Sequence, residues 1–382
     1  MLRLAPILLC VATVALVVLG LIMMQSTSVW VHGIEDPYFF VRKQAVAAGI
    51  GLAVAIGAVW LSPVLLRNYA LWCWVGACGL LCLCFVPGIG VEQYGSKRWI
   101  QIPHLLQFQP SELAKLVVVI SLSAYFARRQ AEIHTCWHGF VQPGLIAVIP
   151  LGLIAIETDV GSALALAVVT GALLFCAGTR LRYLIPAAVS AMAAAAYYIR
   201  HDPVRWARIE AWLDQDNPIY QNGIGMQQFR ALVALGNGGP WGVGLGEGVE
   251  KFGTLTFAHI DFIFPVVGEE LGLPFTLGAV LCYVLIAMAG IAIAVQASNL
   301  FSRCLALGLT CVIVVPAIVN IAVTTSVLPN DGLPLPFVSF GGTSLVFSMV
   351  AVGLLLGVHR LSPAKIHKEF PFGRDSRFSV HL

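Results

Sequence analysis

The chain has 382 residues, of which 59% are hydrophobic and 11% are charged, and its formal net charge is +3 at pH 7. A soluble globular domain carries about a quarter charged residues, so this composition excludes a water-soluble protein and predicts a polytopic membrane protein. The ten cysteines do not form the framework of a short secreted disulfide scaffold, and we expect them to pack as small apolar side chains.

Apolar runs long enough to span a bilayer recur along the whole chain. In chain order they are Leu4–Met24, Val41–Leu61, Tyr69–Val86, Ser111–Phe126, Pro143–Ile156, Val160–Gly178, Leu181–Ile199, Phe262–Ala294, Cys304–Val327 and Ser339–Val358. The first is too long for a signal-peptide core and lacks a clear cleavage site, so we interpret it as an uncleaved span. The eighth is over-long and is expected to begin with an irregular segment. The pattern predicts an all-α fold, with residues 1–382 forming a single transmembrane domain of about ten helices.

The basic residues indicate the orientation of these spans, because Lys and Arg remain on the cytoplasmic side. If the N-terminus lies inside, every predicted inner loop carries arginine and most acidic residues fall on the other side. Both termini are therefore expected in the cytoplasm. The basic tail 359–382 either contacts anionic lipid headgroups or is a plain stop-transfer anchor.

Three predicted outer segments are more than connectors: Pro87–Pro110, Arg200–Ile260 and Val327–Phe340. Long loops in a compact protein are usually functional or disordered. The second, an extracytoplasmic loop over about residues 200–261, contains three tryptophans and a tyrosine. It is too aromatic for disorder, and we expect a partly helical cap on the outer face.

Ionisable residues gather at the predicted outer ends of the spans, which makes a site at the outer leaflet the working hypothesis. Five basic residues are candidates for binding phosphate or pyrophosphate, although they could equally be headgroup anchors: Lys97, Arg98, Arg205, Arg208 and Lys251. Asp261 is either a general base or a helix N-cap. Glu269 and Glu270 lie deeper and are expected to pair with basic residues or helix ends.

Two glycine-rich segments lack any nucleotide-binding pattern. Gly236–Gly248 is interpreted as a tight turn near the membrane, and Leu328–Gly342 as a broken start of the last span. No Ser/His/Asp or Cys/His nucleophile arrangement is present. Two function classes stay open, a transporter or flippase for an amphipathic anion and an integral membrane transferase. The one-sided charges favour the transferase, because a transporter should carry charges near the bilayer midplane.

Six ordered motifs resemble the SEDS family (shape, elongation, division, sporulation), whose members include FtsW, RodA and SpoVE. They are GSKRWI at Gly95–Ile100, FQPSELAKL at Phe108–Leu116, DVGSAL at Asp159–Leu164, GVGLGEGVEKFG at Gly242–Gly253, HIDFIFPVVGEELG at His259–Gly272 and PLPFVSFGGTSL at Pro334–Leu345. GEELG and QPSELAKL look more like the FtsW/SpoVE branch than RodA.

The resemblance implies a peptidoglycan glycosyltransferase of the bacterial cytoplasmic membrane. Such an enzyme polymerises lipid II, a disaccharide-pentapeptide on undecaprenyl pyrophosphate, at the outer leaflet. A lipid II flippase or a division scaffold is the alternative. The implied partners are a class B penicillin-binding protein and other divisome or elongasome proteins, with no nucleic acid. No cofactor or metal is implied, although a divalent cation stays possible.

The same resemblance assigns roles to single residues. The family's essential aspartate matches Asp261 and its outer-loop tryptophan matches Trp99. The remaining motif residues are expected to contact substrate (Asp159 and Ser339) or to support the site (Glu112 and Lys115). Since no second carboxylate is evident for a covalent intermediate, we expect inversion at the anomeric carbon.

This chain departs from the family pattern at three places. Glu157-Thr158-Asp159 stands where members usually read Gln-Pro-Asp, Pro316 stands for a glutamine, and Ile260 stands for a threonine. The first two changes bear on local substrate contacts, and none removes Asp261.

Overall fold

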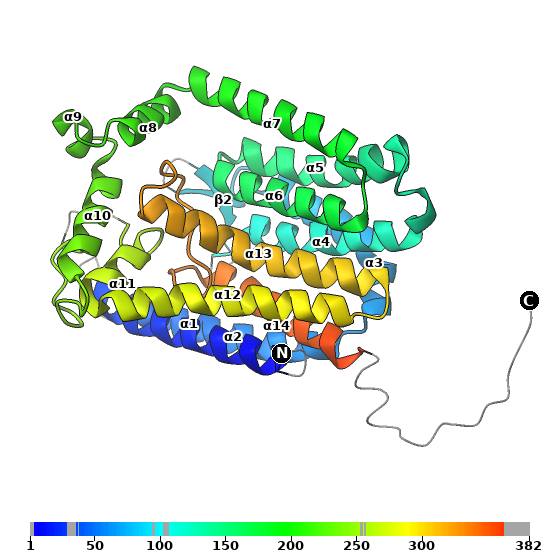
Figure 1. The fold of residues 1–382 in the computed structure, drawn as a ribbon, viewed down its shortest axis with the longest axis horizontal. Coiled ribbons are helices and arrows are strands. Elements are labelled where there is room, and N and C mark those ends of the chain that lie inside the picture. Colours follow the sequence, from blue (N-terminus) through cyan, green and yellow to red (C-terminus); the bar gives the residue numbers. More distant parts are fainter. Residues whose placement is uncertain are drawn as a thin grey trace, which may run out of the picture.

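Helices make up most of the computed structural model, which describes residues 4–28, 36, 38–93, 96–101, 107–252, 255 and 257–362. The long helices are α1 (Ala5–Ser28), α2 (Phe39–Trp60), α3 (Pro63–Leu83), α4 (Pro110–Arg128), α5 (Gln142–Ile156), α6 (Val160–Ala177), α7 (Leu181–His201), α12 (Leu273–Gln296), α13 (Leu300–Thr324) and α14 (Gly342–Arg360). They run roughly side by side along the length of the molecule (Figure 1). The all-α membrane fold predicted from the sequence is confirmed.

Nine helices within the described residues are long and apolar enough to cross a membrane. The remaining predicted span, Leu181–Ile199, is the seventh in chain order. It forms α7, a helix of 21 residues that is not among these nine and has no buried residue. Figure 1 shows it along one edge of the bundle.

Two predicted helix starts were displaced. The third span begins at Pro63 rather than Tyr69, because proline is favoured in the first helical turn and the Ser62 hydroxyl accepts the Val64 N–H. The fifth span begins at Trp137 rather than Pro143, because η2 (Trp137–Val141) is a turn of π-helix that leads into α5.

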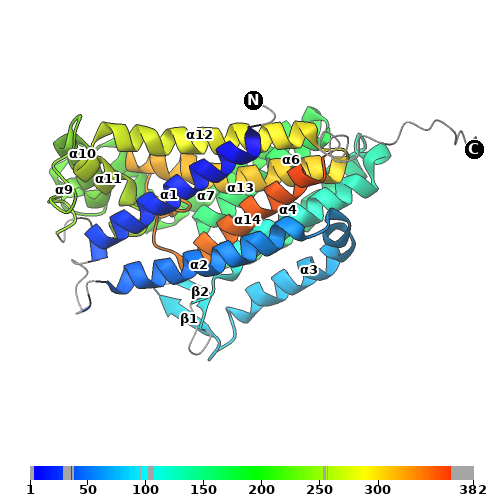
Figure 2. The same cartoon turned by 90° about the horizontal axis from the view of Figure 1, so that it is seen from below.

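The centre of the bundle is built by α4, α13 and α14. Most residues of α4 are buried, and α14 packs along the full length of α2 (Figure 2). The two helices come close at Gly353, where a Cβ atom would lie only 2.3 Å from the Ala55 carbonyl oxygen. Small residues at helix interfaces are typical of membrane bundles, where packing drives association. All ten cysteines are free, as expected.

The described residues of two of the three long outer segments form secondary structure. The first holds an antiparallel hairpin of β1 (Gly90–Gln93) and β2 (Ser96–Ile100), in which Val91 pairs with Trp99. The second holds a cap of three helices, α8 (Pro203–Leu213), α9 (Pro218–Gln221) and α10 (Met226–Gly238), as predicted. The cap is tied to the end of α13, since Trp212 Nε1 donates to the Ser326 carbonyl at 2.9 Å.

The over-long eighth run forms two helices joined at a glycine, rather than the irregular start that was expected. A short helix, α11 (Ile263–Leu271), ends at Gly272, and α12 begins at the next residue. Gly272 has φ +75° and its Cβ would lie 2.5 Å from the Gly242 nitrogen. Only glycine fits this junction.

The third outer segment is irregular between α13 and α14, as predicted for a broken start of the last span. It is held to α2, because Gln44 Nε2 donates to the Ser339 carbonyl at 3.0 Å. Residues 363–382, most of the predicted basic tail, lie outside the described residues.

Candidate functional site

Asp261 lies in the turn that precedes α11. Phe262 occupies the N-cap position of this helix, so the N-cap alternative for Asp261 is wrong. Asn320 of α13 holds the turn in place, because its Nδ2 donates to the backbone carbonyls of Asp261 and Leu333, both at 2.7 Å. One side-chain amide therefore joins the Asp261 turn to the irregular segment before α14.

The Asp261 carboxyl group is set up to exchange a proton near neutral pH. Its Oδ1 atom is buried and has no hydrogen-bond partner among the described residues. Burial raises the pKa of Asp261 to about 7, against the lowering effect of its own backbone N–H and of the positive charges of Arg208 and Arg98. A buried carboxyl with a shifted pKa beside specific charges is typical of a functional site.

A cavity of about 270 Å³ lies next to this turn. Three arginines and three carboxylates dominate its wall, which consists of Arg98, Thr158, Asp159, Val160, Asp202, Val204, Arg205, Arg208 and Asp331. Asp261 lies just beyond the wall, since a Cβ atom on Gly332, the neighbour of Asp331, would lie 3.5 Å from Asp261 Oδ2. The cavity thus joins the first outer segment, the α5–α6 turn, the cap and the last outer segment.

The arginines are held in place but keep free donors. Arg98 is ion-paired with Asp159 at 3.7 Å, and Arg205 with Asp202 at 3.5 Å. Arg98 Nε and Arg205 Nη1 are buried without a hydrogen-bond partner among the described residues. Because buried polar groups are normally satisfied, these guanidinium donors point to an anionic ligand.

Asp159 has a supporting shell of its own. It caps α6 by accepting the Ser162 N–H at 3.2 Å, and Gln109 Nε2 donates to its other oxygen at 3.2 Å. The structure therefore brings Arg98, Arg205, Arg208 and Asp159 together, as expected for a substrate cavity.

Sequence reasoning missed Asp331 and Asp202, which both line the cavity. Burial raises the pKa of Asp331 to about 6, and the nearby charge of Asp159 acts in the same direction. The signal was present in the Asn-Asp-Gly turn of the last outer segment, but nothing in the sequence places that turn opposite the cap.

The α5–α6 turn carries backbone strain at the cavity wall. Thr158 has φ +64°, which is rare for a β-branched residue and costs about 1–3 kcal/mol. Glu157 beside it is buried, and burial raises its pKa to about 8. Strain of this kind persists where the surroundings fix the local geometry.

Two of the predicted substrate residues, Trp99 and Ser339, do not line the cavity. Trp99 lies on β2 beside Arg98, and its Nε1 is buried without a partner in the described part of the chain. Ser339 is buried, and its hydroxyl accepts the Leu335 N–H at 2.8 Å, so it shapes the last outer segment. Lys97 belongs to β2, but its side chain lies outside the described residues.

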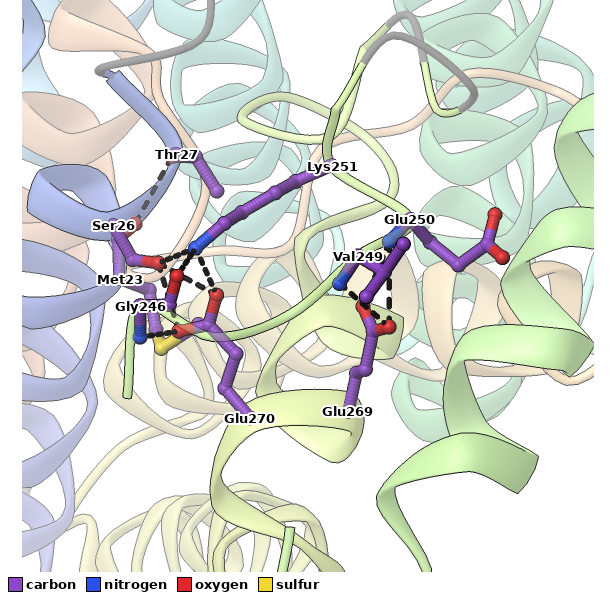
Figure 3. A network of polar contacts seen from close by, with 9 residues as sticks. All are labelled: Met23, Ser26, Thr27, Gly246, Val249, Glu250, Lys251, Glu269 and Glu270. Carbon is purple, nitrogen blue, oxygen red and sulfur yellow. Dashed lines mark hydrogen bonds and ion pairs between the residues drawn. The ribbon is translucent and has the colours of Figure 1, made fainter. Parts of the chain in front are cut away.

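Lys251 lies in a separate buried network rather than on the cavity wall (Figure 3). Its ammonium group is ion-paired with Glu270 at 2.6 Å and donates to Ser26 Oγ at 2.8 Å and the Gly246 carbonyl at 2.7 Å. Glu269 accepts the Val249 N–H at 2.9 Å. The two glutamates thus pair with a basic residue and with backbone N–H groups.

Glu112 and Lys115 form a second buried ion pair, with 2.7 Å between Oε1 and Nζ. Both residues come from α4 and face Pro316, Pro334 and Pro336 around a small enclosed space. This arrangement fits a supporting role for the segment that carries Asp331.

The described residues contain no group of three or more His, Cys, Asp or Glu side chains that could hold a metal ion. The arrangement can bind an anion with its arginines and can accept a proton with Asp261.

Comparison with known proteins is consistent with this geometry. Residues 7–363 match the family model FTSW_RODA_SPOVE, described as cell cycle protein. A relative from Trichlorobacter lovleyi, named probable peptidoglycan glycosyltransferase FtsW, is 36% identical over 90% of each chain.

Two solved structures share the fold. A chain of a peptidoglycan synthase complex that coordinates polymerization and crosslinking aligns with a TM-score of 0.75, 26% identity and coverage of 92% of this chain and 96% of that one. The rod shape determining protein RodA of Thermus thermophilus aligns with a TM-score of 0.69, 27% identity and coverage of 93% and 96%.

Proposed function

This chain belongs to the SEDS family of cell cycle proteins that includes FtsW, RodA and SpoVE, and from that premise we propose that it is a peptidoglycan glycosyltransferase acting in cell division. The name of its FtsW relatives and the polymerization role of the synthase complex support the activity. The higher identity to FtsW than to RodA favours division over elongation. The membrane is the bacterial cytoplasmic membrane, with both termini inside.

The substrate we propose is lipid II, bound from the outer leaflet. Its pyrophosphate would occupy the cavity, where Arg98, Arg205 and Arg208 converge. Guanidinium groups match phosphate oxygens with paired hydrogen bonds. The orphaned donors of Arg98 and Arg205 support this placement, and Trp99 and Ser339 remain candidate contacts for the rest of the substrate.

In the proposed reaction Asp261 is the general base. It takes the proton from the 4-hydroxyl of the acceptor sugar, whose oxygen forms a bond to the anomeric carbon of the growing strand. The bond from that carbon to the lipid pyrophosphate breaks, and the arginines stabilise the charge that develops on the leaving group. The observation that carries this role is the buried Asp261 carboxyl group, whose Oδ1 has no partner among the described residues and whose Oδ2 lies beside Gly332, the neighbour of the cavity residue Asp331.

A single displacement of this kind inverts the anomeric centre. A retaining enzyme would need a second carboxylate about 5 Å from the first to form a covalent intermediate. Product analysis by NMR decides this point, since retention of the donor's anomeric configuration would exclude the single displacement.

Glycan polymerisation on purified lipid II in detergent tests the function. Asp261→Asn keeps the shape of the side chain but cannot take up the proton, so polymerisation should be abolished. Asp214→Asn is the matched control, because Asp214 is exposed on the cap and should leave the rate unchanged. Full activity of Asp261→Asn would exclude the general base.

The same preparation separates the alternative functions. Movement of lipid II across liposomes without polymerisation would favour a flippase. No glycan product from the purified protein, with or without a partner, would favour a scaffold. The partner we propose is a class B penicillin-binding protein, since the matched synthase complex couples polymerization to crosslinking.

A further inference from the structure

The glycine-rich loop between α10 and α11 exposes apolar side chains on its outer side. Tryptophan, valine and leucine alternate with glycine from Trp241 to Gly246. The apolar side chains face outward, with exposed fractions of 83% for Trp241, 45% for Val243, 54% for Leu245 and 62% for Val249. A loop that faced water would present polar side chains here.

Several backbone N–H groups of the loop are turned inward and bonded to α11. The N–H groups of Val243 and Gly244 donate to the carbonyls of Glu269 and Glu270 at 2.9 and 3.0 Å. Gly246 N–H donates to the Glu270 carboxylate at 2.9 Å. Figure 3 shows both glutamates reaching the loop from α11. A backbone satisfied from within can enter an environment that offers no hydrogen bonds.

The shape of the loop depends on its glycines. Gly242 has φ +75°, and a Cβ atom there would lie 2.2 Å from the Glu270 carbonyl oxygen. Gly244 and Gly246 also have positive φ values. The missing side chain at Gly242 lets the loop press onto α11, while Trp241, Val243 and Leu245 stay exposed.

Two contacts fix the height of the loop relative to the membrane. Lys251 Nζ meets Ser26 Oγ at 2.8 Å, and Ser26 lies at the end of the candidate span Ala5–Thr27. On the other side, a Cβ atom on Gly272 would lie 2.6 Å from the Trp241 carbonyl carbon, and the span of α12 begins at Leu273. The loop therefore lies where two spans reach the membrane surface.

The exposed side chains continue an apolar face of α12. Leu273, Phe275 and Leu277 are each more than half exposed on a helix long enough to span the bilayer, which is the condition of a lipid-facing surface. From this continuity we propose that Trp241, Val243, Leu245 and Val249 insert into the outer-leaflet interface and anchor the loop there. Tryptophan is enriched at this level of membrane proteins.

The anchor has a consequence for the neighbouring site. Glu269 and Glu270, which hold the loop, belong to the helix that directly follows Asp261. Lipid contact by the loop therefore fixes the depth of that helix relative to the headgroups. The inference concerns membrane contact only and does not depend on the proposed reaction.

Fluorine NMR of the full chain in lipid nanodiscs tests the insertion. The protein is labelled with 5-fluorotryptophan, and the Trp241 signal is identified by its absence in Trp241→Phe. Broadening by a lipid with a nitroxide on its upper acyl chain is compared with broadening by a water-soluble gadolinium chelate. Trp72, 71% exposed on the candidate span α3, is the lipid-facing reference and is assigned through Trp72→Phe.

We expect the Trp241 signal to be lost with the lipid nitroxide, as for Trp72, and to be less affected by the gadolinium chelate. A stronger effect of the chelate than of the nitroxide would place the loop in water and overturn the proposal. A signal insensitive to both probes would also overturn it. So would protection that develops only when a penicillin-binding protein is added, since the surface would then bind protein.

Discussion

The rate of glycan polymerisation should rise as the pH passes through 7. Burial raises the pKa of Asp261 to about 7, and only its ionised form can accept a proton from the acceptor hydroxyl. With that pKa, about one tenth of the molecules are ionised at pH 6 and about nine tenths at pH 8. We therefore expect kcat/KM for lipid II to increase about tenfold between pH 6 and pH 8.

Removing the positive charge of Arg208 tests whether Asp261 is the group that titrates in this pH profile. Arg208 lowers the pKa of Asp261, so Arg208→Gln should move the midpoint of the pH profile to higher pH. The same change should reduce the maximal rate if Arg208 binds pyrophosphate, but amplitude and midpoint are fitted separately. Arg129→Gln, which alters an exposed ion pair with Glu132 outside the cavity, should leave the midpoint unchanged.

Initial rates with purified protein, measured at low lipid II concentration, report the ionisation of the free enzyme. A wild-type profile that is flat between pH 6 and pH 8 would refute the reasoning. A midpoint that moves to lower pH in Arg208→Gln would do the same, because loss of a positive charge cannot favour a carboxylate.

Three further predictions concern stability and are measured as shifts in thermal unfolding in detergent. Lys251→Met should lower the free energy of unfolding by about 3–5 kcal/mol, because the buried Glu270 carboxylate loses its positive partner. Adding Glu270→Gln should recover part of this loss, and a double variant no more stable than Lys251→Met would contradict the reasoning. Gly242→Ala should lower the Tm because its Cβ has no room, whereas Gly236→Ala, which meets nothing within 4 Å, should not; equal Tm values would exclude the clash. Thr158→Asn should add about 1 kcal/mol, since asparagine tolerates positive φ, and an unchanged Tm would show that Thr158 is unstrained.

The sequence predicts the spans well because hydrophobic length is a local property. Each span needs about twenty apolar residues, and this count depends on no distant part of the chain. The excess length of the eighth run indicated an irregularity but not its position, because the run begins as helix α11 and the break falls at Gly272. The β1–β2 hairpin was not predicted, because its pairing of Val91 with Trp99 leaves no strong alternation in a short polar segment.

The site was only partly predictable because its residues meet through the fold. A motif identified Asp261, and charge type in the outer segments identified the basic residues. Charge type alone could not separate Arg208, on the cavity wall, from Lys251, in a buried ion pair. Asp331 was missed because its position opposite the cap depends on how the segment before α14 folds back. The amide of Asn320, four residues after Pro316, fixes that segment, and the family motif in which Pro316 replaces a glutamine retains this asparagine.

One departure from the family pattern, Glu157 in place of glutamine, changes the charge beside the cavity only slightly. Glu157 stands where relatives usually have glutamine, which suggests a new charge beside the cavity. Burial raises the pKa of Glu157 to about 8, so the carboxyl group is mostly protonated at pH 7. A protonated glutamic acid has about the size and the neutrality of glutamine, and its hydroxyl has the capacity to donate one hydrogen bond.

The packing of α14 along α2 has a consequence for the order of synthesis. Gln44 near the start of the chain donates to the Ser339 carbonyl, and Thr343 donates to the Gln107 carbonyl. The β1–β2 hairpin, which carries Arg98, is therefore synthesised long before the segment preceding α14, which carries Asp331 and completes the cavity. A nascent chain that stops before the segment preceding α14 holds Asp261 and three of the four walls of the cavity. This glycosyltransferase would therefore become competent only after that last wall has been synthesised.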